Sequence, residues 1–179
     1  LLENTPDEFL PKDLGTREEI IEKLSPVIFD QNLYAKRVEQ SEGVDLIAAS
    51  ANNYYEGVTQ QEAEEFYAKM RVENDPEPIS YGLNSKLVKE NGEIYEKVWK
   101  VGGMYSAAIE KIVYWLEKAV NVAENDKQKE IIETLIEYYK TGDLKLFDKY
   151  NVLWVKDLDS RIDFVNGFIE NYGDPLGYK

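Results

Sequence analysis

The chain contains no histidine and no cysteine among its 179 residues. Imidazole and thiolate dominate zinc binding in proteins, and imidazole carries much of the proton transfer near neutral pH. A Ser-His-Asp triad, a Cys-His dyad and an ordinary zinc site are therefore excluded within this chain. No disulfide can form, so the sequence suits a reducing compartment, and we expect a cytoplasmic protein.

Long apolar runs and positive charge are also scarce. The apolar stretches fall far short of the roughly 18 residues of a membrane span, and the N-terminus lacks the basic segment of a signal peptide. The 35 acidic residues outnumber the 21 basic ones, which gives a net charge of −14. Such a field repels phosphate backbones, so we expect neither nucleic acid nor membrane as a partner. Carboxylate chemistry, cation binding or a non-catalytic role remain.

Local patterns predict a helical chain with one β-hairpin. Asn91-Gly92 tolerates the positive φ of a tight turn and predicts a hairpin within 83–101. Val44 to Ser50 fits either a buried strand or a short helix. Capping boxes at Thr16-Glu19 and Thr59-Glu62 and a stop at Gly142, together with apolar spacing, predict helices. The expected helices cover 17–24, 60–72, 104–123, 127–140, 143–150 and 161–171. We therefore expect an α+β fold, mainly helical with a small antiparallel sheet, in a single domain over 1–179.

Four aromatic residues on the expected helices have a simple structural interpretation. Tyr114, Trp115, Tyr138 and Tyr139 lie within two of the amphipathic segments. Aromatic side chains of amphipathic helices usually bury their large apolar area against neighbouring elements. We expect all four to pack between helices and not to line a binding site.

An acidic group near the C-terminus is the first candidate site. On a helix, Asp163, Asn166 and Glu170 would lie at i, i+3 and i+7 and would share one face. Two carboxylates and an amide can hold an ammonium group through charge-assisted hydrogen bonds. The same spacing also fits a solvated helix face that binds nothing.

A polar and aromatic segment is the second candidate site. Asn53, Tyr54 and Tyr55 follow Asn52 directly. Tyrosines offer flat apolar area with a polar tip, so the segment could line a peptide groove. The alternative is a loop whose tyrosines cover the edge of the core.

Three segments resemble the dipeptidyl peptidase III family of zinc exopeptidases, and most closely its bacterial members. The first runs from Ile47 to Thr59 and contains the Asn-Asn-Tyr-Tyr-Glu-Gly run. The second is the hairpin region, Leu83 to Lys89 with Tyr95 to Val98. The third and most specific is Trp154 to Gly177, which contains Gly-Phe-Ile-Glu followed by Asp-Pro-Leu-Gly.

The resemblance implies a part of the lower lobe of a two-lobed peptidase, truncated before residue 1 and after residue 179. Zinc would lie in the missing catalytic lobe of the same protein, so no cofactor is expected in this chain. Short peptides would be the substrates, and dipeptides would be released from their N-termini. An isolated chain would be inactive. A non-catalytic helical interaction or scaffold domain is the alternative function.

The resemblance also implies roles for individual residues. The family's acid just before the Gly-Phe-Ile-Glu run is matched by Asp163, which would bind the free amino end of the substrate. Animal members read Glu-Ser-Tyr where this chain has Asp163-Phe164-Val165. Val165 thus replaces the tyrosine expected to contact the reacting carbonyl. We also expect residues from Gly173 onward to be poorly packed within this chain, because they would lead into the missing lobe.

Overall fold

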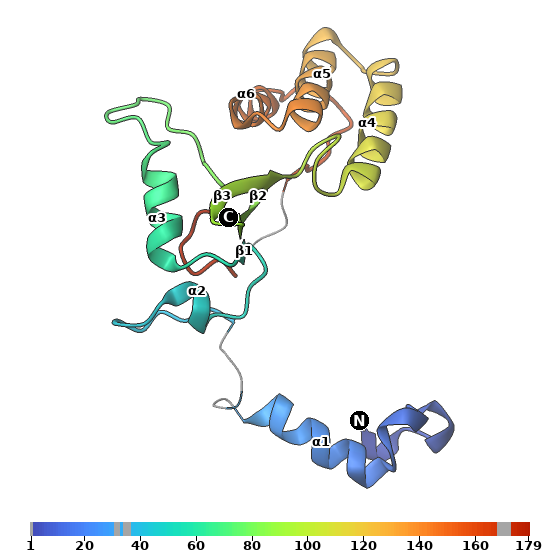
Figure 1. The fold of residues 1–179 in the computed structure, drawn as a ribbon. Coiled ribbons are helices and arrows are strands. Elements are labelled where there is room, and N and C mark those ends of the chain that lie inside the picture. The colour runs from blue at the N-terminus through green and yellow to red at the C-terminus, as the bar shows by residue number, and fades with distance from the viewer. Residues whose placement is uncertain (1, 31–32, 34–36, 168–172) are drawn as a thin grey trace.

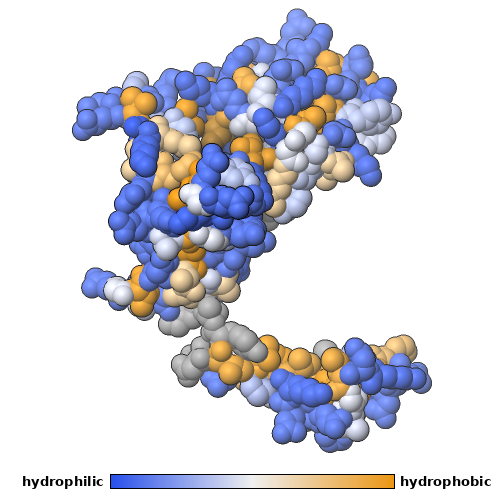
Figure 2. Space-filling model, in the orientation of Figure 1, coloured by the Kyte–Doolittle hydropathy of each residue, from blue (hydrophilic) through white to orange (hydrophobic). Residues whose placement is uncertain are grey.

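The computed structural model describes residues 2–30, 33, 37–167 and 173–179. Its N-terminal part contains three short 3-10 turns, η1 (Leu2–Asn4), η2 (Asp7–Phe9) and η3 (Lys12–Leu14), followed by helix α1 (Arg17–Phe29). Figure 1 shows this part set apart from the other elements. Figure 2 shows orange, apolar surface along it, where Ile28 and Phe29 are exposed.

A three-stranded mixed sheet forms the middle of the molecule. Strands β2 (Ser85–Glu90) and β3 (Glu93–Val98) pair antiparallel, with Glu90 opposite Glu93. Asn91 and Gly92 both have positive φ, which confirms the tight turn predicted from their sequence. The short strand β1 (Tyr55–Glu56) adds to β2 in parallel, which the sequence did not predict. The α+β class with its small sheet is confirmed.

Short helices and a buried cluster surround the sheet. Helices α2 (Leu46–Ala49) and α3 (Gln60–Ala68) flank β1 along the chain. One core cluster joins β1, α3 and β2 through buried side chains that are mostly apolar or aromatic: Tyr55, Val58, Ala63, Tyr67 and Leu87. These contacts fix the sheet against α3 by burying aromatic and aliphatic area.

Three helices form a bundle beyond the sheet, at the top of Figure 1. They are α4 (Ser106–Val120), α5 (Asp126–Thr141) and α6 (Leu144–Val155). Helix α5 lies in the middle and buries two faces, one packed with α4 and the other with α6. Gly142 ends α5 in the left-handed conformation, at the stop predicted for it.

Several helix predictions need correction. Pro26 lies inside α1, whose last turn continues to Phe29, so the helix does not stop before this proline. Helix α3 ends at Ala68, and α6 extends to Val155. Tyr138 is buried as predicted, but Tyr114 and Trp115 are 51% and 68% exposed. The prediction that these two pack between helices is wrong, because they project from the solvent face of α4.

The largest correction concerns the expected helix over 161–171. Residues 161–167 contain no helix, and 168–171 lie outside the described residues. Side chains from the start of α5 bind the backbone of residues 161 and 162, so these groups do not enter an i to i−4 ladder. The helical face proposed for Asp163 and Asn166 therefore does not exist in this form.

Candidate functional site

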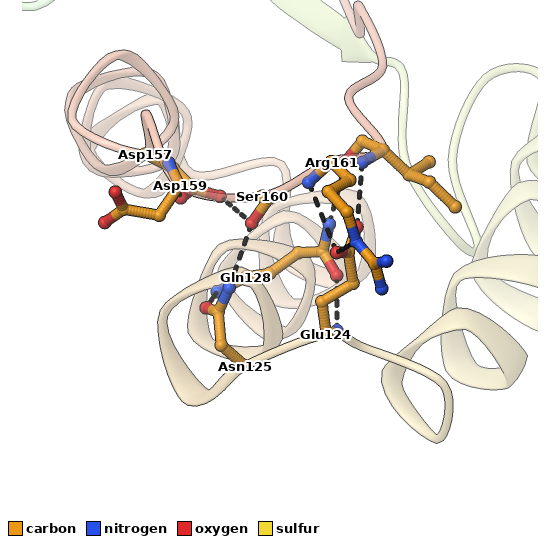
Figure 3. A network of polar contacts seen from close by, with 8 residues as sticks. Glu124, Asn125, Gln128, Asp157, Asp159, Ser160 and Arg161 are labelled. Atoms are coloured by element: carbon orange, nitrogen blue, oxygen red, sulfur yellow. Dashed lines mark hydrogen bonds and ion pairs between the residues drawn. The ribbon is translucent and has the colours of Figure 1, made fainter.

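The loop 156–167 crosses the bundle and is anchored by the N-terminus of α5. Glu124 accepts hydrogen bonds from the backbone N–H of Arg161 and Ile162 and from Arg161 Nε, at 3.2, 2.7 and 3.0 Å. Gln128 is buried, and its Nε2 donates to the carbonyl of Ile162 at 2.9 Å. Figure 3 shows these side chains reaching from the helix toward the loop. Both backbone polar atoms of Ile162 are thus held, the N–H by Glu124 just before α5 and the carbonyl by Gln128 within α5.

A second group of contacts holds the first half of this loop. The Ser160 hydroxyl donates to Asp157 Oδ2 and accepts from Asn125 Nδ2, at 2.5 and 3.1 Å. Asn125 also caps α5, since its side chain accepts from the amide of Gln128. Hydrogen bonds from Ser160 and from backbone amides keep the pKa of Asp157 below its ordinary value. The loop is therefore tied to the capping residue of the helix.

Asp163 lies at the exposed surface directly after this anchor. Its Oδ1 accepts from the indole Nε1 of Trp154 on α6 at 2.7 Å and from the amide of Phe164 at 2.8 Å. Within the described part of the chain, no hydrogen bond engages Oδ2. One carboxylate oxygen is thus fixed by the protein, and the other can accept a hydrogen bond from a ligand.

Asn166, three residues after Asp163, contacts the helical bundle. The Tyr139 hydroxyl donates to Asn166 Oδ1 at 2.8 Å, and burial raises the pKa of Tyr139. Asn166 Nδ2 and the Tyr150 hydroxyl are buried, and neither has a partner among the described residues. Burial is also the main cause that raises the pKa of Tyr150 to about 12, with Asp163 contributing. Asn166 is therefore bound to a tyrosine of α5, whereas Asp163 is held by Trp154 of α6.

The second candidate segment lies in a different place. Tyr55 is buried, and its hydroxyl donates to the carboxylate of Asp174 at 2.8 and 3.0 Å. The same carboxylate accepts from the backbone amides of Leu176, Tyr178 and Lys179, at 3.0, 2.7 and 2.9 Å. A single carboxylate therefore fixes the turn over 174–179 to strand β1.

Lys179 completes this buried group. Its ammonium donates to the Tyr67 hydroxyl, the Gly82 carbonyl and Ser85 Oγ, at 2.9, 3.0 and 3.3 Å. The Tyr67 hydroxyl in turn donates to Glu96 at 3.0 Å. Burial lowers the pKa of Lys179 to about 8. The prediction of poor packing after Gly173 is wrong, because this segment enters the core with Tyr178 stacked near Tyr67.

The structure thus separates the predicted site residues into two groups. Asp163 and Asn166 contact the helical bundle, while Tyr55 lies in strand β1 next to Asp174 and Tyr54 directly precedes that strand. In the ranges that the structure describes, no hydrogen bond or ring contact joins the two groups. Asn53 is exposed, and Tyr54 is half-buried. Glu170 lies outside the described residues.

Three residues important to these groups, Glu124, Gln128 and Lys179, were missed from the sequence, and Asp174 was expected beside Asp163 and not beside Tyr55. Glu124 and Gln128 contact a loop more than 30 residues later, and Asp174 and Lys179 contact residues about 100 positions earlier. Asp-Pro-Leu-Gly does indicate a turn, but nothing in the pattern identifies its partner. Contacts between residues this far apart in the sequence cannot be predicted from the spacing of neighbouring residues.

The described residues of this chain do not fit a zinc ion. Among the described residues, no group of three or more histidine, cysteine, aspartate or glutamate side chains is placed to hold a metal. The chain also lacks both residue types that provide neutral nitrogen or thiolate ligands. The described helices include none long and apolar enough to cross a bilayer.

Comparisons with known proteins confirm the family resemblance seen in the sequence, while the expected closeness to bacterial members stays a prediction. The chain is 31% identical to "Dipeptidyl peptidase 3" of Rattus norvegicus and 32% identical to that of Homo sapiens, over 77 residues in each case. A protein of the same name from Dictyostelium discoideum is 28% identical over 79 residues. These matches cover 43–44% of this chain and only 10–11% of the relatives. The family model described as "Peptidase family M49" matches residues 31–179, and the chain belongs to this peptidase family.

Proposed function

We propose that this chain is the substrate-binding part of a zinc-dependent dipeptidyl peptidase that releases N-terminal dipeptides from short peptides. The family match over residues 31–179 is the observation that carries this proposal. Because the residues present do not fit zinc, the metal would be held by another part of the protein, the missing catalytic lobe. When bound there, zinc would supply activation of water.

In this proposal, Asp163 binds the free amino end of the peptide. Its exposed position and the open Oδ2 support this role, because a carboxylate oxygen can accept a charge-assisted hydrogen bond from an ammonium group. Trp154 orients the carboxylate through Oδ1. An exopeptidase that releases dipeptides needs such an amine contact, because binding the free amino end determines which peptide bond is cleaved.

The remaining predicted residues have supporting roles in the same proposal. Asn166 and Glu170 would add polar contacts near the amine, and Asn53 and Tyr54 would contact the peptide farther along. Tyr55 would act indirectly, since its hydroxyl is held by Asp174. Val165 is 87% exposed and carries no hydroxyl, so contact with the reacting carbonyl would come from another side chain.

Product analysis tests the proposed function. The full-length protein that contains this chain should be incubated with a peptide of four to eight residues, and the products identified by mass spectrometry. We expect intact N-terminal dipeptides and a substrate shortened by two residues at each step. Release of single amino acids, or cleavage at internal bonds, would contradict the proposal.

A further inference from the structure

We propose that Glu124 and Gln128 are positioning residues for Asp163, and this inference rests on the proposed function of that carboxylate. Ile162, the residue directly before Asp163, has both backbone polar atoms bound by α5 and its N-terminal flank. Glu124 accepts from its N–H at 2.7 Å, and Gln128 donates to its carbonyl at 2.9 Å. We call this pair of side chains the Ile162 clamp; Figure 3 shows both side chains in place.

The clamp is built as a rigid unit. Gln128 is only 8% exposed, and its Oε1 accepts from the backbone amide of Glu124 at 2.8 Å. The backbone N–H of Gln128 donates to the side chain of Asn125, the capping residue of α5. The Glu124 side chain is 18% exposed although it carries a charge. Each half of the clamp therefore fixes the other, and both are fixed to the start of a helix whose central residues are buried.

Electrostatics reinforce the clamp. The Arg161 side chain and the amides of Ile162 and Arg161 hold the pKa of Glu124 below its ordinary value, so its carboxylate is charged at neutral pH. A charged acceptor binds backbone N–H groups more strongly than a neutral one. The Arg161 side chain itself is 89% exposed, and Glu124, taken as a whole residue, is also exposed, so this ion pair lies at the surface and the backbone hydrogen bonds are the main contacts of the clamp.

The clamp determines where the Asp163 carboxylate can lie. The backbone of Asp163 is held on its N-terminal side by the clamp, and the Asp163 Oδ1 is held by the indole of Trp154 on α6. Two separate helices thus restrict the backbone and the side chain of one exposed acid. A preorganised carboxylate loses less conformational entropy when it binds a ligand than a mobile one would. Neither Glu124 nor Gln128 needs to touch the peptide for this effect.

Steady-state kinetics of the full-length protein test the clamp. The variants are Glu124→Gln, Gln128→Met and Asp163→Asn, with Glu133→Gln as the control for an exposed acid on the same helix. Each is assayed with a free-amine peptide and with its N-acetylated counterpart. Loss of one or two hydrogen bonds that orient an acid should lower kcat/KM for the free amine about five-fold, mainly through KM. The acetylated peptide and the control should change less than two-fold.

A double-mutant cycle separates positioning from general stability. If the clamp acts through Asp163, adding Glu124→Gln or Gln128→Met to Asp163→Asn should cause little further loss with the free amine. Equal losses for both peptides, or full additivity in the Asp163→Asn background, would overturn the clamp. If Asp163→Asn abolishes the preference for free amines while both clamp variants keep it, the clamp alone is wrong. If Asp163→Asn keeps that preference, the amine-binding role of Asp163 fails, and the clamp with it.

Discussion

At the scale of single residues, Lys179 carries the clearest pH dependence. Burial lowers its pKa from an ordinary 10.5 to about 8, so the folded state binds the proton less tightly than the unfolded state. The resulting cost to stability is fully present below pH 8 and is relieved as the pH rises from about 8 to about 10.5. Across this window, the free energy of unfolding of the wild type should rise relative to Lys179→Met, by at most about 3 kcal/mol. Denaturant unfolding at several pH values checks this, and a difference that is constant with pH would contradict it.

Of the hydrogen-bonded pair Tyr55 and Asp174, Asp174 should contribute more to the free energy of unfolding. Tyr55→Phe removes one buried hydrogen bond and should lower the free energy of unfolding by about 1 kcal/mol. Asp174→Ala leaves the Tyr55 hydroxyl and three backbone amides without their acceptor, so its loss should be at least about 3 kcal/mol. Tyr95→Phe, which affects an exposed pair with Glu90, is the matched control. Equal effects of all three variants in thermal or denaturant unfolding would show that Asp174 does not organise this turn.

At the scale of elements, the capping box of α3 allows a direct test. Thr59 accepts from the amide of Glu62, and Glu62 accepts from the amide of Thr59 and from Lys89 on β2. Thr59→Ala should therefore lower the free energy of unfolding by about 1 kcal/mol. Gln61→Ala, on the exposed face of the same helix, should change it by less than about 0.5 kcal/mol. A Thr59→Ala effect no larger than that of the control would mean that the cap is not needed.

Elements defined by local chemistry could be predicted from the sequence. Both capping boxes, the Asn91-Gly92 turn and the Gly142 helix stop lie where expected, because each depends on a few adjacent residues. The expected helix after residue 160 failed because side chains from α5 bind its backbone. The parallel pairing of β1 and the packing of the C-terminal turn also depend on distant residues. The candidate acidic site was therefore proposed from residue type and resemblance, while the side chains that hold its loop could not be predicted.

At the scale of the whole molecule, the metal of the proposed peptidase would lie in a different part of the protein. A preparation of residues 1–179 should hold no stoichiometric zinc after dialysis and should have no peptidase activity. The reason is the absence of histidine and cysteine, which leaves only oxygen ligands. Elemental analysis measures the zinc directly. One tightly held zinc ion per chain would contradict this division of roles.

The proposed function requires that Asp163 binds the free amino end of the peptide substrate. The most direct measurement compares kcat/KM of the full-length wild type and Asp163→Asn on a free-amine peptide and on its N-acetylated counterpart. A charge-assisted hydrogen bond contributes roughly 1.5–3 kcal/mol, so the free-amine peptide should lose about tenfold to a hundredfold. The acetylated peptide, already a poor substrate, should lose little further. Glu170→Gln belongs in the same experiment as the second acid of the site. Equal losses for both peptides in Asp163→Asn, or a selective loss seen only in Glu170→Gln, would contradict the claim.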